Sequence, residues 1–495
     1  MRDRTRCRRS VMARYLVTAA LVALVGCNWS DLVKTDLPPT TTDPEALKTQ
    51  DGALSIYHGS IHGFRKAFGG ASAYILASGH LSDELQTGAY ASGGEVLPLL
   101  TGSLAEFDSR DMPEDPILRS WWVESWYRDI NMARNQSVDA IYYLRQYAPL
   151  LPKDLVGHMF DIRGLALLHL ADIFCSGIPL THYKVEGGFT YEGGLTTDSV
   201  YSLALTWFDS ALTTVPDSAN FRYLAEVGRA RALLNLGRFA EAAQAVQDVP
   251  TDFVYLARYA EDYNGSFSNN WAWNLNTYSD PEGGFGTIGD NEGGNGLPFV
   301  SSNDPRVPVI PAPVQSQQYP ATSYVLPSWM FPATAPWNGT SGEAKKNGVD
   351  IPVASGIEAR LVEAEAAANA GDGSFLTILN ELRTSCVDAA SCPTPAPAGS
   401  GGVEGLPPLV DPGSKDARVK MVYDERAYWL FLTGHRQGDL RRLVRVYGWP
   451  QNEVYPSGSF PLGGKQEYGT YTNIPIPNSE RAINTKFKGC LNRDA

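Results

Sequence analysis

The stretch ERAYWLFLTGHRQGDLRRL, residues 425–443, combines a glutamate, a histidine, an aspartate and four arginines with several large apolar side chains. Charge of this density is typical of a catalytic cluster, and it is equally typical of ion pairs inside a fold. The local structure, and the partners that the rest of the chain offers, decide between these two interpretations.

The spacing of apolar residues predicts two helices in this stretch. The first helix covers 416–433 and ends at Gly434, because glycine is the common residue after a helix C-terminus. The second helix runs from His435 to about Tyr447. A short joint therefore connects the two helices, and side chains from both can meet across it.

Arg426 is the residue that separates the two interpretations. One face of the first helix carries Val419, Val422, Arg426 and Trp429. An arginine on an apolar face needs a carboxylate partner, and Glu425 or Asp439 could supply it. The stretch has no nucleophile and no base with an orienting partner, so a structural ion pair explains it better than catalysis.

The clearest signature of a helix pair is RARALLNLGRFAEAAQAV, residues 229–246. Small residues at Ala232, Gly237, Ala240 and Ala243 allow two helices to approach closely. This pattern resembles the tetratricopeptide helix–turn–helix, whose units bury their apolar faces by stacking. Weaker pairs occur at 357–383 and around the opening stretch. Helices are also predicted at 44–68, 117–147, 155–175, 198–213, 221–236 and 238–248.

Residues 263–352 differ from this helical pattern, because they are rich in Gly, Pro, Asn, Ser and aromatic residues. A long irregular segment inside a compact domain is usually functional. A second Pro- and Gly-rich connection covers 393–412. The sequence therefore predicts a mainly α fold, in which tetratricopeptide-like helix pairs form a scaffold for a long insertion of loops and small strands.

The N-terminus has the features of an export signal over residues 1–26. Six arginines precede an apolar run, YLVTAALVALVG (15–26). A membrane-spanning helix needs about 20 residues, so this run is too short. The residues LVGC (24–27) resemble the bacterial lipobox, which makes Cys27 the predicted lipid attachment site, with an ordinary cleaved signal as the alternative. Residues 27–43, polar and rich in Pro and Thr, are predicted to form a tether.

The charge of the chain disfavours one class of partner. The sequence has 41 basic and 54 acidic residues, and loss of 1–26 removes six Arg and one Asp, which leaves 35 and 53 and a net charge of −18. Such a surface repels phosphate backbones, so no nucleic-acid partner is expected. No later apolar stretch is long enough to span a membrane, so the lipid is the expected membrane attachment.

Four cysteines follow Cys27. Cys386 and Cys392 enclose a short loop, VDAAS, and are predicted to form a local disulfide bond in an oxidising compartment. A zinc site is the alternative for this pair, but the sequence has no CxxC pair that would complete such a site. Cys175 and Cys490 cannot be assigned from the sequence.

A search for catalytic signatures finds none with the context that it requires. GFGTIG (284–289) matches GxGxxG, but no helix follows it to bind phosphate. His58 and His62 lie four residues apart on a predicted helix, without a third metal ligand. The acidic residues Asp83–Glu84 and Glu363/Glu365 could form carboxylate pairs for glycoside hydrolysis, but solvated or helix-capping carboxylates explain them as well. We expect no enzyme activity, no metal and no cofactor.

The opening stretch also resembles a family signature. RagB/SusD-type proteins, outer-membrane lipoproteins that accompany TonB-dependent transporters, have a motif close to ERxxELxxEGHRxxDLxR near the C-terminus. The matching residues here are Glu425, Arg426, Leu430, Gly434, His435, Arg436, Asp439, Leu440 and Arg442. Two glutamates of the family are replaced by Trp429 and Thr433, so any ion pair that they form is absent here. Three further segments match in the family's order: RGLALLHLADIFCSGIPL (163–180), NDPR (303–306) and IPIPNSERAIN (474–484).

This resemblance implies a single SusD-like domain over 44–495. It has tetratricopeptide-like pairs at about 155–248, 355–385 and 416–447, and a ligand-face insertion at about 263–352. The family acts without catalysis. Its members cap a SusC-like, TonB-dependent barrel at the cell exterior and help to capture glycans, in some cases peptides, for nutrient uptake.

The ligand residues do not transfer from the family motif, so they are predicted from physical chemistry. Sugar rings present apolar C–H faces that stack on exposed aromatic side chains with amides alongside. The candidates are Tyr90, Trp271, Trp273, Tyr278, Tyr324, Trp329 and Trp337. The alternatives to an oligosaccharide-binding lipoprotein are a peptide-binding member of the family, a secreted carbohydrate-active hydrolase and a tetratricopeptide adaptor.

Overall fold

The structure is a computed structural model, which describes twelve ranges of the 495-residue chain. These are residues 45–70, 73–86, 104–112, 120–183, 188–215, 218–259, 287–307, 309–313, 322–325, 350–385, 406–460 and 467–494. The predicted signal, the tether with Cys27, and the pair Cys386–Cys392 lie outside the described residues.

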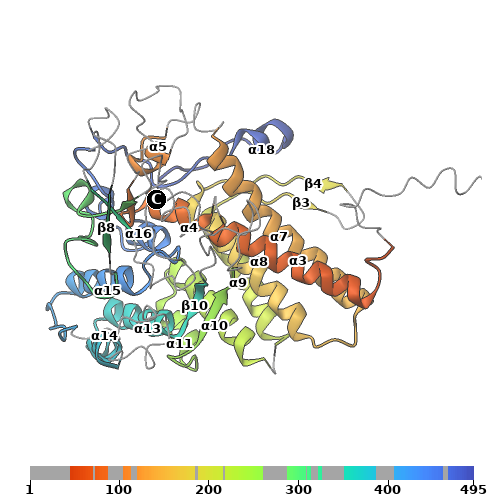
Figure 1. Cartoon of the computed structure of the whole chain (residues 1–495), viewed down its shortest axis with the longest axis horizontal. Helices are drawn as coiled ribbons and strands as arrows, with labels where there is room; N and C mark the ends of the chain where they lie inside the picture. The colour runs from red at the N-terminus through yellow and green to blue at the C-terminus, as the bar shows by residue number, and fades with distance from the viewer. Residues whose placement is uncertain are drawn as a thin grey trace, which may run out of the picture.

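Six helices from the first half of the chain pack in sequence order, each against the next. They are α3 (Gln50–Gly69), α7 (Trp121–Tyr147), α8 (Asp154–Ile173), α9 (Thr197–Leu212), α10 (Ala219–Asn235) and α11 (Phe239–Val246). Figure 1 shows α3, α7 and α8 running side by side along one half of the molecule. This succession is the stacked arrangement expected of a tetratricopeptide-like scaffold.

The start of α3 differs from the prediction. The helix begins at Gln50 instead of following Asp43–Pro44, because the side chain of Thr49 accepts a hydrogen bond from the Gly52 N–H and caps the helix there. Close packing farther along depends on Gly228, where an added Cβ would lie 2.4 Å from the ring of Phe208. A side chain at that position would push α9 and α10 apart.

The two clearest helix pairs of the sequence are confirmed. The segment 229–246 forms the end of α10 and the whole of α11, joined at Gly237 with φ +72°. The segment 357–383 forms α13 (Gly356–Ala370) and α14 (Ser374–Ser385), which pack against each other. Helix α13 also packs on α11, so the second pair continues the stack.

The pair predicted around the opening stretch has a different geometry. Helix α15 (Lys415–Trp429) packs on α13 and α14, whereas α16 (Arg436–Arg445) packs on α4 (Tyr74–Leu81), α8 and α10. Helix α15 ends at Trp429, four residues before its predicted end, and turns lead from there to Gly434. Gly434 has φ +83°, and an added Cβ would lie 2.6 Å from the ring of Tyr74, so the joint requires glycine here.

The described strands form five two-stranded antiparallel sheets. The pairs are β1 (Leu85–Gln86) with β7 (Thr287–Ile288), β2 (Ile178–Pro179) with β5 (Gly194–Leu195), β3 (His182–Tyr183) with β4 (Phe189–Thr190), β6 (Val254–Ala257) with β10 (Ile351–Ser355), and β8 (Ile310–Pro313) with β9 (Thr322–Val325). Short helical segments add α5 (Leu104–Asp108), a 3₁₀ turn at Glu292–Gly294, α17 (Gln451–Val454) and α18 (Asn478–Ile483). The β6–β10 pair matters most, because it brings the two ends of the long insertion together.

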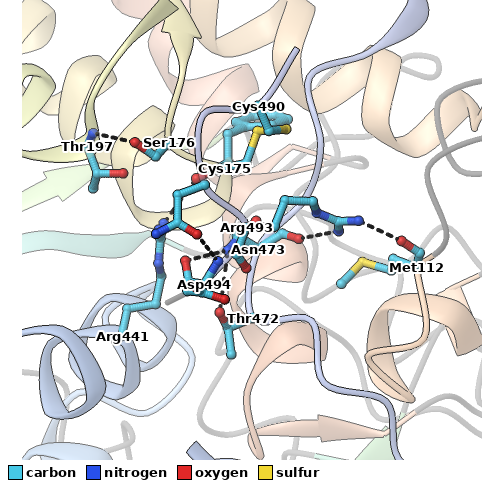
Figure 2. The surroundings of a disulfide bond; sticks show 12 residues. Met112, Cys175, Ser176, Thr197, Arg441, Thr472, Asn473, Cys490, Arg493 and Asp494 are labelled. Carbon is cyan, nitrogen blue, oxygen red and sulfur yellow. Dashed lines mark hydrogen bonds between the residues drawn. A yellow bond between two sulfur atoms is a disulfide. The ribbon is translucent and has the colours of Figure 1, made fainter. Parts of the chain in front are cut away.

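A disulfide bond between Cys175 and Cys490, which the sequence left unassigned, fastens the C-terminal tail to the end of α8 (Figure 2). The tail also contacts the region around α5, since the Arg493 guanidinium donates to the carbonyl oxygens of Met112 and Asn473 at 2.9 and 3.0 Å. The tail is therefore part of the scaffold.

Loss of this disulfide should lower stability, because the bond joins residues 315 positions apart and long loops gain most from closure. We expect Cys490→Ser to lower the free energy of unfolding in urea by about 2–4 kcal/mol. Cys386→Ser, which would break only a short predicted loop, is the comparison. Non-reducing peptide mapping should recover Cys175 linked to Cys490; free thiols at both positions would contradict the assignment.

Candidate functional site

Arg426 of α15 binds Asp439 of α16 through two hydrogen bonds. Nε of Arg426 donates to Oδ2 of Asp439 at 2.8 Å, and Nη2 donates to Oδ1 at 2.9 Å. Such a two-point contact fixes direction as well as distance. The predicted ion pair is confirmed, and Asp439 is the partner from the two carboxylates that the sequence left open.

Arg442 extends this pair into a buried network. It donates to Asp439 at 2.8 Å, and to both carboxylate oxygens of Glu365 in α13 at 2.8 Å each. The hydroxyl of Tyr423 donates to the same glutamate at 2.8 Å. Burial opposes the charge on Asp439, but Arg426 and Arg442 outweigh burial and lower the pKa of Asp439 well below its usual value. Asp439 is therefore ionised at neutral pH.

Arg441 attaches α16 to the C-terminal end of α8. Its Nη1 donates to the carbonyl oxygens of Ala171, Asp172 and Phe174 at 2.5, 3.1 and 3.1 Å. Carbonyl groups in the last turn of a helix have no partner within the helix and attract cations. Arg441 thus supplies hydrogen-bond donors to the carbonyl oxygens at the end of α8, and these oxygens compensate the buried positive charge of Arg441.

Asp83 and Glu84, which follow α4, hold neighbouring backbone in place. Asp83 accepts two hydrogen bonds from Arg436, at 2.6 and 2.8 Å, and one from the Leu297 N–H at 2.9 Å. Glu84 accepts from the Leu432 N–H at 3.0 Å, and its burial raises the pKa of Glu84 to about 8. Both residues are buried, so the expectation of solvated or helix-capping carboxylates is wrong here.

Glu425 connects α15 to the long insertion. Its carboxylate accepts from Arg306 at 2.7 Å, from Arg383 of α14 at 2.5 Å and from the Trp429 indole at 3.2 Å. Arg306 is also held by Asp304 at 2.7 Å. The NDPR segment of the insertion is therefore fastened to the same helix that carries Arg426.

Aromatic contacts reinforce this connection. The ring of Phe299 lies 5.4 Å from that of Tyr428 and 4.8 Å from that of Phe431, measured between centroids. The guanidinium of Arg306 lies 5.0 Å from the Tyr428 ring centre. Edge-to-face and tilted ring pairs, together with a cation–π contact, add specific geometry to apolar burial.

His435 is a structural residue in the same network. Its Nε2 lies 3.2 Å from Glu358, which also accepts two hydrogen bonds from Arg231 at 2.8 Å each. Burial lowers the pKa of His435, so the neutral form is favoured. Its Nδ1 lies 2.7 Å from the hydroxyl of Thr433, which stands where the family motif has a glutamate. A neutral contact replaces any ion pair at that position.

These contacts form a base, which we call the insertion base, that holds the described part of the insertion on the scaffold. The chain leaves the described residues after Gln86 and returns at Thr287, and these two residues are partners in the β1–β7 sheet. Residues 289–307 then pack over the α15–α16 joint through Leu297, Phe299 and Arg306. In Figure 1 this base lies around α16, α4 and β8.

The predicted ligand aromatics cannot be placed within this base. Tyr324 lies in β9, where its backbone pairs with that of Pro311. The other six candidates lie outside the described residues: Tyr90, Trp271, Trp273, Tyr278, Trp329 and Trp337.

The remaining sequence candidates are not brought together. His58 and His62 are exposed on α3. Glu363 is half-buried and pairs with Arg360 of the same helix, α13, at 3.1 Å, while Glu365 is buried. The twelve described ranges contain no group of three or more His, Cys, Asp or Glu side chains able to hold a metal ion. Likewise, no helix within them is long and apolar enough to cross a membrane.

One buried cluster was missed by the sequence reasoning. Glu292 lies near Asp108, and burial raises the pKa of Glu292 well above its usual value, with Asp108 adding to the effect. Arg110 stands opposite, 5.2 Å from the ring centre of Tyr455 and 5.8 Å from that of Tyr468. No local pattern predicts this cluster, since it joins three segments that are far apart in the sequence, around residues 108–110, 292 and 455–468.

Comparison with known proteins shows which solved structures share this fold. No family model and no curated protein matches the sequence. A SusD-like protein from Bacteroides fragilis NCTC 9343 superposes with a TM-score of 0.59 at 12% identity, covering 91% of this chain and 98% of that one. The surface glycan-binding protein A from Bacteroides thetaiotaomicron, in complex with laminarihexaose, gives a TM-score of 0.60 at 13% identity, covering 89% and 99%.

A laminarin-binding SusD-like protein matches with a TM-score of 0.57 at 14% identity, over 90% of this chain and 99% of that one. The resemblance to RagB/SusD-type proteins is therefore confirmed at the level of the fold: the chain has the SusD-like fold over nearly its whole length.

Arg426→Ala should destabilise the protein strongly, because it leaves Asp439 buried with one arginine partner fewer. We expect a loss of about 3–5 kcal/mol in the free energy of unfolding by urea. Arg418→Ala on the same helix removes an exposed contact to Asp411 and should have a much smaller effect. Equal losses in the two variants would refute the buried network as a source of stability.

Glu84→Gln should change how stability depends on pH. Because burial raises the pKa of Glu84 to about 8, folding favours its protonated form, so its contribution to stability falls as pH rises from its unfolded pKa of 4.5 toward 8. Glutamine keeps the acceptor for Leu432 and does not titrate. Urea unfolding at pH 5 and pH 8 should show that the free energy of unfolding of the variant, relative to that of the wild type, is higher at pH 8 than at pH 5. The same relative free energy at both pH values would disprove the proton linkage.

Proposed function

We propose that this protein is a non-catalytic, lipid-anchored RagB/SusD-family protein of the cell surface. In this proposal it captures oligosaccharide and caps a SusC-like, TonB-dependent outer-membrane transporter during nutrient uptake. The observation that carries the proposal is the fold, which extends over about nine-tenths of the chain and is shared with a glycan-binding protein solved with laminarihexaose.

The arrangement of the insertion supports a binding role. Its two ends meet in the β6–β10 sheet, and its middle is fastened to the α15–α16 joint by Leu297 and Arg306. A binding face needs loops that are held at their bases, because ordering them on binding would reduce affinity. The predicted aromatic candidates all belong to segments that start or end at this base.

The carboxylates argue against the hydrolase alternative. A glycosidase needs two carboxylic groups that face the substrate, about 5–9 Å apart. The acidic residues first considered for such a pair are engaged elsewhere: Asp83 with Arg436, Glu84 with the Leu432 N–H, and Glu365 with Arg442. These carboxylates hold parts of the scaffold together, a role that is compatible with a binding protein.

The anchor and the location follow from the N-terminal sequence. We propose that residues 1–26 are removed and that Cys27 carries the lipid, with residues 27–43 as the tether. A peptide ligand remains the second candidate, since nothing in the described residues selects between a sugar and a peptide chain.

Isothermal titration with a panel of oligosaccharides tests the proposal. The double variant Trp271→Ala/Trp273→Ala should bind at least about tenfold more weakly than the wild type, a loss of ~1.4 kcal/mol, because stacking on sugar rings is removed. Tyr142→Ala, an exposed aromatic on the scaffold helix α7, is the matched control and should bind normally. Release of shortened sugars from the panel would establish the hydrolase instead.

The transporter partner needs a separate experiment. Extraction of intact membranes in mild detergent, followed by affinity purification of this protein, should recover a large β-barrel protein. Absence of any barrel after chemical cross-linking would contradict the capping role while leaving glycan binding intact.

A further inference from the structure

Four exposed apolar side chains lie on elements of the scaffold that contact one another. Among the described residues, eight large apolar side chains are exposed; one of them lies at the start of α7, one on β4, one on α18 and one on the C-terminal tail. These four are Trp121 (60% exposed), Phe189 (58%), Ile483 (58%) and Leu491 (61%). We call these side chains, with the basic residues described below, the tail surface.

Hydrogen bonds join the elements that carry these four side chains. Ser479, at the start of α18, donates through its N–H to Glu124 of α7 at 3.1 Å, one turn from Trp121. Asn484, at the end of α18, donates to the carbonyl oxygen of Glu192 at 2.9 Å, next to the β4 strand that carries Phe189. The tail then reaches Leu491, whose N–H donates to the Ser176 carbonyl at 2.7 Å.

Charge in the C-terminal segment of the tail surface is opposite in sign to that of the chain as a whole. The segment 478–494 carries four basic residues, Arg481, Lys486, Lys488 and Arg493, and two acidic ones, Glu480 and Asp494. Glu124 of α7 and Glu192 lie beside it, and Ser479 donates to the Glu124 carboxylate. Glu480 is buried and accepts from Thr181 and Asn484, so it does not face the solvent. Lys486 and Lys488 are exposed. A local excess of cations on a chain with a net charge of −18 after removal of 1–26 is therefore presented beside exposed Trp and Phe rings.

We propose that the tail surface rests on an anionic lipid surface. Interfacial lipid contacts combine aromatic rings at the headgroup level with cations that meet lipid phosphates. An ordinary protein interface would be expected to lack this exposed lysine pair, since lysine is depleted there. The proposal rests on the lipid anchor of the proposed function, which would hold the protein next to such a surface.

The position of the anchor permits this contact. The described chain starts at Glu45, five residues before α3, and Glu45 lies eighteen positions after Cys27. An extended chain of that length reaches roughly 60 Å. Figure 1 shows the start of α3 and the β3–β4 hairpin toward the same end of the molecule's long axis. The lipid on Cys27 and the tail surface can therefore engage one membrane together.

Vesicle flotation tests the proposal with the mature chain carrying Cys27→Ser, so that no lipid anchor contributes. The wild-type surface should float with mixed phosphatidylcholine–phosphatidylglycerol vesicles at low salt, and should bind at least about fivefold less with pure phosphatidylcholine or at high salt. Trp121→Ala/Ile483→Ala and Lys486→Glu/Lys488→Glu should each reduce flotation by a similar factor. Thermal unfolding and oligosaccharide titration of the same variants should remain as in the wild type.

A matched control exists at the other end of α7. Leu150 is 93% exposed and lies three residues from the exposed Lys153, so Leu150→Ala/Lys153→Glu removes the same kinds of group from a different surface. This variant should float normally. The lipid proposal would be overturned if the protein with an unsubstituted tail surface failed to float, or if the control variant lost as much flotation as the tail-surface variants. Normal glycan binding in that case would leave the proposed function standing. Loss of barrel recovery without loss of flotation in the tail-surface variants would show a protein interface instead.

Discussion

Buried arginines around α16 set the constraint on which the rest of the structure depends. Arg426, Arg436, Arg441 and Arg442 are at most 6% exposed, and a guanidinium removed from water must be compensated by carboxylates or carbonyl oxygens. Their compensating groups come from α8, α13, α16 and the loop after α4. Satisfying these four charges therefore draws together segments from most of the chain.

The same constraint explains how a stack of helices can carry a long irregular insertion. Asp83 binds Arg436 and the Leu297 N–H together, and Glu425 binds Arg306 and Arg383 together. Each of these carboxylates faces the scaffold on one side and the insertion on the other. Under the proposed function, ligand contacts then fall to loop residues that do not take part in this network.

Local patterns predicted the parts of the fold that local interactions decide. The Gly-Arg-Phe turn within 229–246 predicted the α10–α11 pair. Asp439 lies only thirteen positions after Arg426, across one helix joint, so the sequence could name it as one of two possible partners of Arg426. The pair Asp83–Arg436 joins residues 353 positions apart, and Cys175–Cys490 joins residues 315 apart, so no spacing could reveal either. The start of α3 was missed because Thr49 is one of several residues able to cap that helix. The ligand aromatics stay predictions, because six of the seven lie outside the described residues and the side chain of Tyr324 is not described.

The central claim is that these buried charges couple the insertion base to the scaffold. A double-mutant cycle of Asp83→Asn and Arg436→Met, measured by urea unfolding, tests it most directly. The account predicts a coupling free energy of about 2–3 kcal/mol between the two substitutions, because each removes the partner of the same buried contact. Additive effects, with a coupling below ~0.5 kcal/mol, would contradict it and return the stretch 425–443 to the search for a catalytic or ligand-binding role.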